Sequence, residues 1–323
     1  MLSVVLTSYN YARFLATAFT ALAAQTRPAD ELIVIDDRSN DDSVAIITSF
    51  LGRFGNARLV QNPHNLGTVA NLNRGLELAR GTVVFFAAAD DVTYPLLLER
   101  GMGLLDGHPN AALFSARSDI IDSAGTVTGR LATAIPLRRP GFIPPDAVAR
   151  QLMRDDNWLL GNTTLYRRDA LADAGGFPVE FGSFCDGYVS RLLAARHGAC
   201  YSPEVLCSWR RHAGGYAWSQ TADLDQAQQL AAAVERRMEA AGATFPQGYA
   251  HRWRQRYLFG ARRFALARRR EEARSQGLVA AMWARFREIA MTAALFLAYR
   301  PWDCTSVVCR RLSVWRHRMS EGR

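Results

Sequence analysis

The 323-residue sequence contains no lysine, so all 39 of its basic residues are arginines. We attribute this absence to a bias of composition. The sequence also lacks a Cys-x-x-Cys pair, and its cysteines are few and odd in number, five in all. Cys304 and Cys309 have too few neighbouring histidines for a zinc site. These features predict a protein of the reducing cytoplasm.

Three further absences exclude other classes of protein. The sequence does not open on a basic segment followed by an apolar one, so no secretory signal is predicted. No Gly-x-Gly-x-x-Gly follows the first predicted strand, which argues against a dinucleotide-binding dehydrogenase. The apolar helix predicted over residues 278–299 is free of charge only from residue 289 onward, over 11 residues. Because a membrane-spanning helix needs about 20 residues, we do not expect it to cross a bilayer.

Apolar residues are plentiful, and the charge is unevenly distributed. A hydrophobic content of 49% supports a large core. The formal net charge is +9, but residues 250–323 alone carry 17 arginines and five acids, a balance of +12. Residues 1–249 therefore have a balance of −3. The basicity belongs to the C-terminal region.

Apolar runs with strand character alternate with helical periodicity up to about residue 120. This alternation predicts parallel β-α-β units, and thus an α/β domain with a mostly parallel sheet flanked by helices. Residues 119–160 are rich in Gly, Pro and Arg with weak periodicity, and we interpret them as a loop or flap. After residue 221 the pattern is helical. We expect a catalytic domain over residues 1–220, with halves at 1–118 and 119–220, and a helical region over 221–323.

Acidic pairs end two of the predicted strands. Asp36 and Asp37 close the apolar run of residues 32–35, and Asp90 and Asp91 close that of residues 82–88. The first strand also ends in polar residues, at 7–10. Ligands of open α/β sheets bind outside the carboxyl ends of the strands. The pattern predicts a cleft for a metal and a polar ligand at this edge.

Several ordered motifs resemble those of family 2 glycosyltransferases, which have the GT-A fold and an inverting mechanism. The similarity covers about residues 1–215 and is carried by segments 3–10, 31–42, 65–81, 161–169, 175–178 and 209–212. It implies transfer of a sugar from a nucleoside-diphosphate sugar to a hydroxyl of a polysaccharide or lipid-linked glycan.

The resemblance also implies roles for individual residues. Those expected to bind the nucleotide sugar are Thr7, Ser8, Tyr9, Asp37, Asn65, Gly67, Asn71, Asp90, Arg210 and His212. Asp90 matches the last acid of the family's Asp-x-Asp motif and would hold Mg²⁺ or Mn²⁺, assisted by Asp91. This chain has Ala88 where many members have the first acid, so we expect weak metal affinity before the donor binds.

Asp186 matches the acid that deprotonates the acceptor hydroxyl in inverting members. A helix follows it, so an ordinary helix cap is the alternative. His212 would reach the metal or the phosphates, or belong to a solvated basic loop. Asn162 and Trp158 are expected on the acceptor side.

The arginine-rich C-terminal region leaves two interpretations open. It either lies on an anionic membrane surface, which would place the protein peripherally on the inner face of the cytoplasmic membrane, or packs as a helical subdomain with a solvated basic face. The rival functions are a nucleic-acid-binding protein that uses this region and a non-catalytic GT-A domain. The acidic cleft argues against nucleic acid, which is not an expected partner.

Overall fold

The computed structural model describes residues 1–212, 215 and 223–275 of the chain. The helix expected over residues 278–299, and most of the basic C-terminal region, lie outside the described residues. By its internal contacts the chain divides into two compact units. One comprises residues 1–220 and 229–254, and the other comprises residues 221–228 and 255–323.

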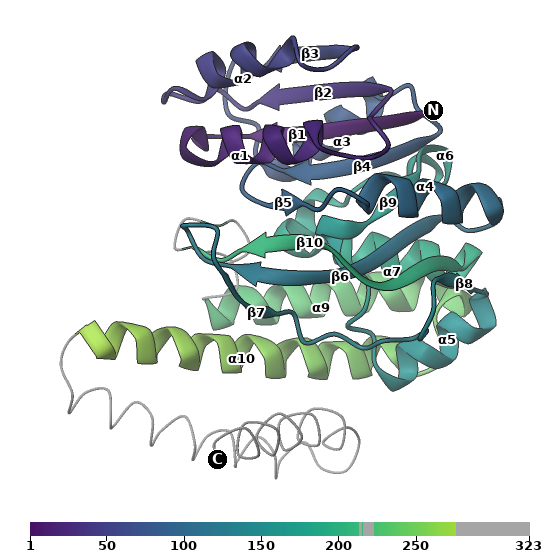
Figure 1. Ribbon diagram of the computed structural model, residues 1–323. Coiled ribbons are helices and arrows are strands. Elements are labelled where there is room, and N and C mark those ends of the chain that lie inside the picture. Colours follow the sequence, from purple (N-terminus) through teal and green to yellow (C-terminus); the bar gives the residue numbers. More distant parts are fainter. Residues whose placement is uncertain (213–214, 216–222, 276–323) are drawn as a thin grey trace, which may run out of the picture. The chain divides into compact units, whose positions relative to one another are not determined.

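The chain alternates between strands and helices in its first half, as predicted (Figure 1). The first nine of these elements are β1 (Leu2–Ser8), α1 (Ala12–Ala23), β2 (Glu31–Asp36), α2 (Ser43–Leu51), β3 (Ala57–Gln61), α3 (Thr68–Leu78), β4 (Val83–Ala88), β5 (Val92–Thr93) and α4 (Leu97–Gly107).

The second half is less regular. Its elements are β6 (Leu113–Ile121), β7 (Val127–Arg130), β8 (Gly141–Ile143), α5 (Pro145–Arg154), η1 (Gly161–Thr163), β9 (Leu165–Arg167), α6 (Arg168–Asp173), η2 (Val179–Phe184), α7 (Cys185–His197), β10 (Ala199–Arg210), α9 (Leu224–Ala240), η3 (Gly242–Thr244) and α10 (Tyr249–Ser275). The interpretation of residues 119–160 as a loop or flap was wrong in part. They contain the short strands β7 and β8 and the helix α5. Each of these elements is too short to give a clear hydrophobic period in the sequence.

One mixed sheet organises the first unit. Its strand order is β3-β2-β1-β4-β9-β6-β10-β5, with β7 paired to β6 and β8 paired to β10. Neighbours β1, β2, β3 and β4 are parallel, as are β6 and β10. The short β9 runs antiparallel to both β4 and β6 and joins the two parallel blocks. The sheet is therefore mostly parallel, as predicted.

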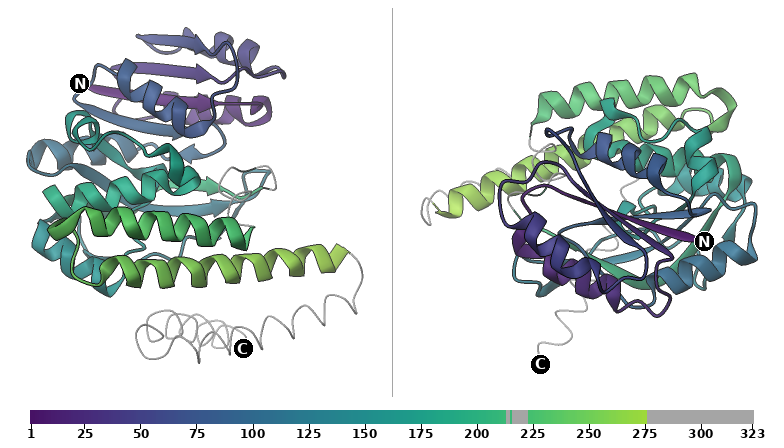
Figure 2. Two further views of the ribbon diagram at one scale, coloured as in Figure 1. Left: turned by 180° about the vertical axis from the view of Figure 1, so that it is seen from behind. Right: turned by 90° about the horizontal axis from the view of Figure 1, so that it is seen from above.

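Helices cover both faces of this sheet (Figure 2). The apolar sides of α1 and α4 pack on the face that carries Val4 and Leu6, and all of these side chains belong to one buried cluster. Helix α3 lies on the opposite face, where Gly75 approaches Val5 so closely that a Cβ at residue 75 would lie 2.3 Å from the Val5 side chain. The alternation of neighbouring β1 residues between the two faces explains why the strand is buried throughout.

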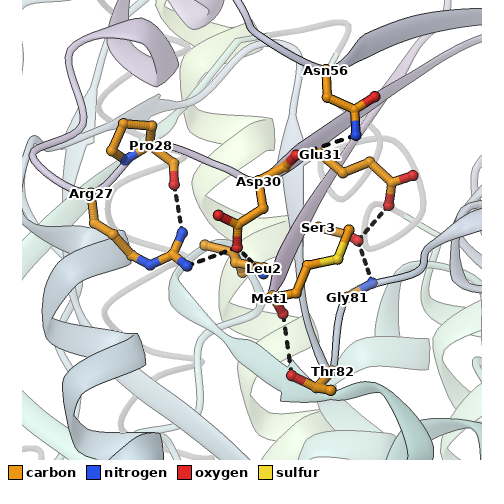
Figure 3. Close-up of polar contacts among 10 residues, drawn as sticks. All are labelled: Met1, Leu2, Ser3, Arg27, Pro28, Asp30, Glu31, Asn56, Gly81 and Thr82. Atoms are coloured by element: carbon orange, nitrogen blue, oxygen red, sulfur yellow. Dashed lines mark hydrogen bonds and ion pairs between the residues drawn. The ribbon is translucent and has the colours of Figure 1, made fainter.

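Paired polar groups fix the end of the sheet at which the parallel strands β1, β2 and β4 begin (Figure 3). We call this end the N-terminal edge, and the opposite end the C-terminal edge. Glu31, at the start of β2, accepts hydrogen bonds from the Ser3 hydroxyl at 2.6 Å and the Arg80 amide at 3.0 Å. Its other oxygen pairs with Arg58 at 2.9 Å. The Ser3 hydroxyl in turn accepts the Gly81 amide. These bonds tie β1, β2 and β3 to the segment that leads into β4.

Candidate active site

A cleft of about 420 Å³ opens at the opposite edge of the sheet, where β1, β2, β4 and β10 end. The side chains that line it and carry chemistry are Thr7, Ser8, Tyr9, Asp37, Asn71, Asp90, Asp91, Asn162, Asp186, Arg210 and His212. The predicted convergence of three strand ends on one cleft is thus seen in the structure.

Asp90 and His212 face each other across this edge. Their Oδ2 and Nε2 atoms lie 2.9 Å apart, and both side chains are largely buried. The other ring nitrogen, Nδ1, lies 3.3 Å from Arg13 Nη2. Because a guanidinium only donates hydrogen bonds, Nδ1 accepts and the proton is assigned to Nε2, which donates to Asp90. Arg13, in α1, thereby orients His212.

Arg210 is held among backbone carbonyls. Its Nε donates to the Asp90 carbonyl at 2.6 Å, and its Nη1 donates to the Asp122 carbonyl at 2.8 Å. Its guanidinium also lies 4.6 Å from the centre of the Phe14 ring. These contacts commit Nε and Nη1 to fixing the loops around the cleft, which differs from the expected contact with the donor phosphates.

Asp91 is buried beside Asp90 and accepts the Arg210 backbone amide at 2.8 Å. Burial, and then the Asp90 carboxylate, raise the pKa of Asp91 well above its usual range, against the lowering effect of the Arg210 amide and the Asn162 side chain. Two adjacent carboxylates in this cleft thus repel each other. A bound cation would relieve this repulsion.

Asp37 stabilises the loop that precedes α3. Its carboxylate accepts the Leu66 amide at 2.8 Å, the Gly67 amide at 2.9 Å and the Asn62 side chain at 2.7 Å. Burial alone would raise its pKa, but these hydrogen bonds, with one from Asn71, outweigh burial and hold the pKa of Asp37 below its usual value. Asp37 is therefore an ionised group at the floor of the cleft.

Residues at the end of β1 have the properties of a ligand-binding wall. The Ser8 hydroxyl is buried in the cleft wall and has no hydrogen-bond partner among the described residues. Tyr9 lines the same wall with 45% of its surface exposed, a high value for a large aromatic side chain. A buried hydroxyl without a partner and an exposed ring suit a polar ligand with a planar group.

Asp186 lies in the first turn of α7, where its Oδ1 accepts the Gly187 amide at 2.6 Å. Burial raises the pKa of Asp186, while this amide and the charge of Arg191 act in the opposite direction. Phe184 is the residue that caps α7, so the alternative role of Asp186 as N-cap does not describe its position. A carboxylate with a raised pKa in a cleft can take up a proton.

Not every predicted site residue lines the cleft. Among the described residues, Asn65 and Gly67 lie beside it and bond to each other and to Asp37. Trp158 is fully buried in the core, which overturns its expected place on the acceptor side. The sequence interpretation missed Arg13, since one arginine in an amphipathic helix carries no signal of its own.

Asp90 and His212 carry a carboxylate and an imidazole that can bind a divalent cation, which His212 Nε2 would do only after giving up the proton that it donates to Asp90. In the part of the chain that the structure describes, no group of three or more His, Cys, Asp or Glu side chains could hold a metal ion. Carboxylate oxygens suit both Mg²⁺ and Mn²⁺. The residues fit a metal that takes its remaining ligands from a bound molecule.

The cleft thus lies at the carboxyl ends of a mostly parallel sheet and is lined by carboxylates from two strand ends and one helix, the usual place for ligands of open α/β sheets. Residues 3–174 match the model of glycosyl transferase family 2. The match covers more than half of the sequence, and the chain belongs to this family. The expected fold and family are confirmed, and the protein is a glycosyltransferase.

Similar proteins come from several bacteria. An uncharacterized protein of Mycobacterium tuberculosis is 30% identical over 66% of this chain and 67% of its own length. An uncharacterized glycosyltransferase of Nostoc is 27% identical over 72% of each chain.

The fold is shared with solved structures of glycosyltransferases. S. aureus TarS in complex with UDP-GlcNAc matches with a TM-score of 0.60 at 16% identity, over 93% of this chain and 91% of that one. The mannosyltransferase PcManGT from Pyrobaculum calidifontis, in complex with GDP-Man and Mn²⁺, matches with a TM-score of 0.59 at 21% identity, over 93% and 81% of the two chains.

Proposed function

We propose that the protein transfers a sugar, with inversion at the anomeric carbon, from a nucleoside-diphosphate sugar to a hydroxyl of a polysaccharide or lipid-linked glycan. The observation that carries this proposal is the presence of Asp186 in the same cleft as the Ser8, Tyr9 and Asp37 wall and the Asp90–His212 pair. A base and a nucleotide site are the two parts that such a reaction needs.

The nucleotide is proposed to bind at the ends of β1 and β2. Tyr9 offers an exposed ring for stacking on the base, and the buried Ser8 hydroxyl offers a donor and an acceptor. Asp37 keeps the loop before α3 in place and presents a carboxylate to hydroxyl or imide donors. Asn71, which lines the cleft from α3, would complete this pocket.

The diphosphate is proposed to lie near Asp90 and His212. Four carboxylates line the cleft, at residues 37, 90, 91 and 186, while Nε and Nη1 of Arg210 are already bonded to carbonyls. A dianionic leaving group therefore needs added positive charge. Asp90, with His212 and Asp91, would hold Mg²⁺ or Mn²⁺, and the charge of such an ion would offset that of the leaving diphosphate. The ability of PcManGT to be captured with Mn²⁺ supports this proposal.

Asp186 is proposed as the general base. As the acceptor oxygen forms its bond to the anomeric carbon, the hydroxyl proton passes to a carboxylate oxygen of Asp186. The bond from the anomeric carbon to the phosphate oxygen breaks at the same time, and the electron pair leaves with the nucleoside diphosphate. Displacement from the opposite face inverts the anomeric configuration. The raised pKa of Asp186 makes its carboxylate a stronger base once it is ionised.

Association with a membrane is a separate proposal. In the part of the chain that the structure describes, no helix is long and apolar enough to span a bilayer. The basic balance of +12 over residues 250–323 supports contact with an anionic surface, and a cytoplasmic, peripheral location stays a prediction.

Replacement of Asp186 tests the mechanism. We expect Asp186→Asn to lower turnover by about 10²-fold or more, the scale of a lost general base, and to leave the Kd for UDP or GDP unchanged. A screen of UDP-, GDP- and dTDP-sugars with Mn²⁺ or Mg²⁺ first identifies the donor. Asp169→Asn, on a carboxylate with 77% exposure, is the matched control. Proton NMR of the product reports inversion. Wild-type turnover by Asp186→Asn would refute the role of Asp186.

A further inference from the structure

A buried set of polar contacts lies behind the helix that carries Asp186. Arg191, one and a half turns further along α7, donates from Nη1 to the Gly187 carbonyl at 2.8 Å. Its Nη2 donates to the Asp156 carbonyl at 2.9 Å, and its Nε lies 3.3 Å from Asp156 Oδ2. Both side chains have only 8% exposure. The guanidinium thus connects the first turn of α7 to the segment between α5 and η1.

The start of α10 completes this set of contacts. The Tyr249 hydroxyl, in the first residue of α10, donates to Asp156 Oδ2 at 2.9 Å, and Tyr249 is fully buried. One turn later Trp253 packs on Phe184, with ring centres 4.8 Å apart. Phe184 is the N-cap of α7. Two side chains of α10 therefore contact, directly or through Asp156, the turn that presents Asp186.

Gly161 bounds Asp186 on another side. A Cβ at residue 161 would lie 1.7 Å from Asp186 Oδ2 and 2.9 Å from its Cγ. The carboxylate is therefore seated directly against the backbone of η1. Asp186 is held by the η1 backbone at Gly161 and by the Gly187 amide, and the turn that carries it is held by α10 through Phe184. The side chain therefore has little freedom to move.

We infer that Arg191 is a positioning residue for Asp186, locked in place by Asp156 and Tyr249, so that the start of the C-terminal helical region contributes to the geometry of the base. This inference rests on the proposed function of Asp186. Arg191 touches neither the cleft nor a substrate, and it acts through the first turn of α7 and through its charge.

The charge of Arg191 has a defined effect on Asp186. Among the described residues, Arg191 and Cys185 from α7 and Tyr166 from β9 interact electrostatically with Asp186. Burial, and then the Asp186 charge, raise the pKa of both Cys185 and Tyr166, so both stay neutral near pH 7. Arg191 is the charged neighbour that favours the ionised form of Asp186. Its removal should therefore shift the onset of activity to higher pH.

The test compares the pH profiles of full-length variants. For Arg191→Met we expect kcat at pH 7 to fall roughly tenfold to 10²-fold, the cost of a misplaced catalytic group, with the acid limb of kcat/KM moved to higher pH. The Kd for UDP or GDP should stay unchanged. Arg191→Lys keeps the charge and should restore the acid limb in part.

Two further variants guard against a failure to fold. Arg191→Met removes the positive charge beside the buried Asp156 carboxylate, which is costly, so Arg191→Met combined with Asp156→Asn removes both charges. Tyr249→Phe removes one hydroxyl and should lower kcat by about threefold, in line with one lost hydrogen bond. Arg58→Met is the matched control, since it breaks the pair with Glu31 at the far edge of the sheet. It should lower Tm without moving the acid limb.

The outcomes are distinguishable. Wild-type kcat and an unmoved acid limb in the folded Arg191→Met variants overturn the inference, as would a loss of Tm alone. Should Arg191→Met not fold in either form, unchanged kcat and acid limb in Tyr249→Phe overturn it. If Asp186→Asn itself turns over at the wild-type rate, the proposed function fails first, and the inference fails with it.

Discussion

The two edges of one sheet carry acidic residues of the same kinds and use them in opposite ways. At the N-terminal edge, both oxygens of Glu31 are paired inside the protein, one with Arg58 and the other with the Arg80 amide and the Ser3 hydroxyl. Figure 3 shows the contact with Ser3. At the C-terminal edge, Asp90 shares one contact with His212, and Asp91 repels it. Paired acids hold strands together, whereas underpaired acids are available to a ligand.

The pKa values of the two edges follow this difference. Burial acts on Glu31 as it acts on Asp91, but the hydrogen bonds from Ser3 and Arg80 and the charge of Arg58 reverse its effect, and the pKa of Glu31 is lowered. For Asp91 and Asp186 burial prevails, and the pKa is raised. In the cleft, burial therefore disfavours the ionised forms of Asp91 and Asp186 but not that of Asp37, and perturbed carboxyl groups of this kind cluster at functional sites.

If acids at the C-terminal edge serve a ligand, the largest loss of turnover is expected for a substitution of Asp90. We expect Asp90→Asn to lower metal-dependent turnover by more than about 10²-fold, because several kcal/mol of charge stabilisation at the leaving group would be lost. Tm should not fall, since the variant relieves a repulsion. Turnover and Mn²⁺ binding by calorimetry in the presence of UDP or GDP measure it, with the exposed Asp106→Asn as control. Full activity and unchanged metal dependence would show that Asp90 does not hold the metal.

Glu31 should show the opposite pattern. We expect Glu31→Gln to lower the free energy of unfolding by about 2 kcal/mol, because bonds to a charged group are lost, and to leave kcat unchanged. Because its folded pKa lies below the ordinary Glu value of 4.5, this stability is present above that value and is lost as the pH falls through the folded pKa. The wild type should thus lose more stability below pH 4.5 than the variant. Denaturant unfolding at pH 7 and at lower pH checks this; equal losses would refute it.

Asp37 combines both patterns, since it is paired and also lines the cleft. We expect Asp37→Asn to weaken nucleoside-diphosphate binding by about tenfold, the equivalent of one charge-assisted hydrogen bond, because the loop at Leu66 and Gly67 loses acceptors. Turnover at saturating donor should change less. Calorimetry with UDP or GDP separates the two effects. Unchanged affinity together with a lower Tm would place Asp37 with Glu31 as a purely structural acid.

The smallest expected effect concerns Arg38, next to Asp37. Among the described residues, only Asn10 and Arg38 have positive φ without being glycine, and both lie at the C-terminal edge. A left-handed conformation costs an ordinary residue roughly 1–2 kcal/mol. We therefore expect Arg38→Gly to raise the free energy of unfolding by about 1 kcal/mol, measured by urea unfolding. Arg38→Ala keeps the Cβ and should give no gain; an equal gain would exclude backbone strain as the cause.

The parts of the fold that the sequence predicted are those governed by local pattern. The strands β1, β2 and β4 and the acids that follow them were predicted because buried parallel strands are continuous apolar runs, and their ends share an edge. The position of Asp186 after a turn and before a helix was also predicted, through its family motif. Each of these features is contained in about ten consecutive residues.

The features that escaped prediction depend on distant partners. Asp156, Arg191 and Tyr249 are separated by 35 and 58 residues, and an arginine on an apolar helix does not reveal which acid it meets. The close approach of Gly161 to Asp186 likewise joins two segments whose spacing carries no period. The β9 strand was missed as an element because its three residues are too short for a pattern.

The position of β9 has a consequence for the synthesis of the chain on the ribosome. The edge of β4 that it covers, Val83 to Phe85, is fully apolar and lies about 80 residues before the strand that pairs with it. At about 5–20 residues per second, this edge waits roughly ten seconds for its partner. During that time a completed β1–β4 block exposes an unpaired, apolar stretch of strand, which can pair with another chain. The nascent protein should therefore depend on chaperones at this stage, before its active site exists.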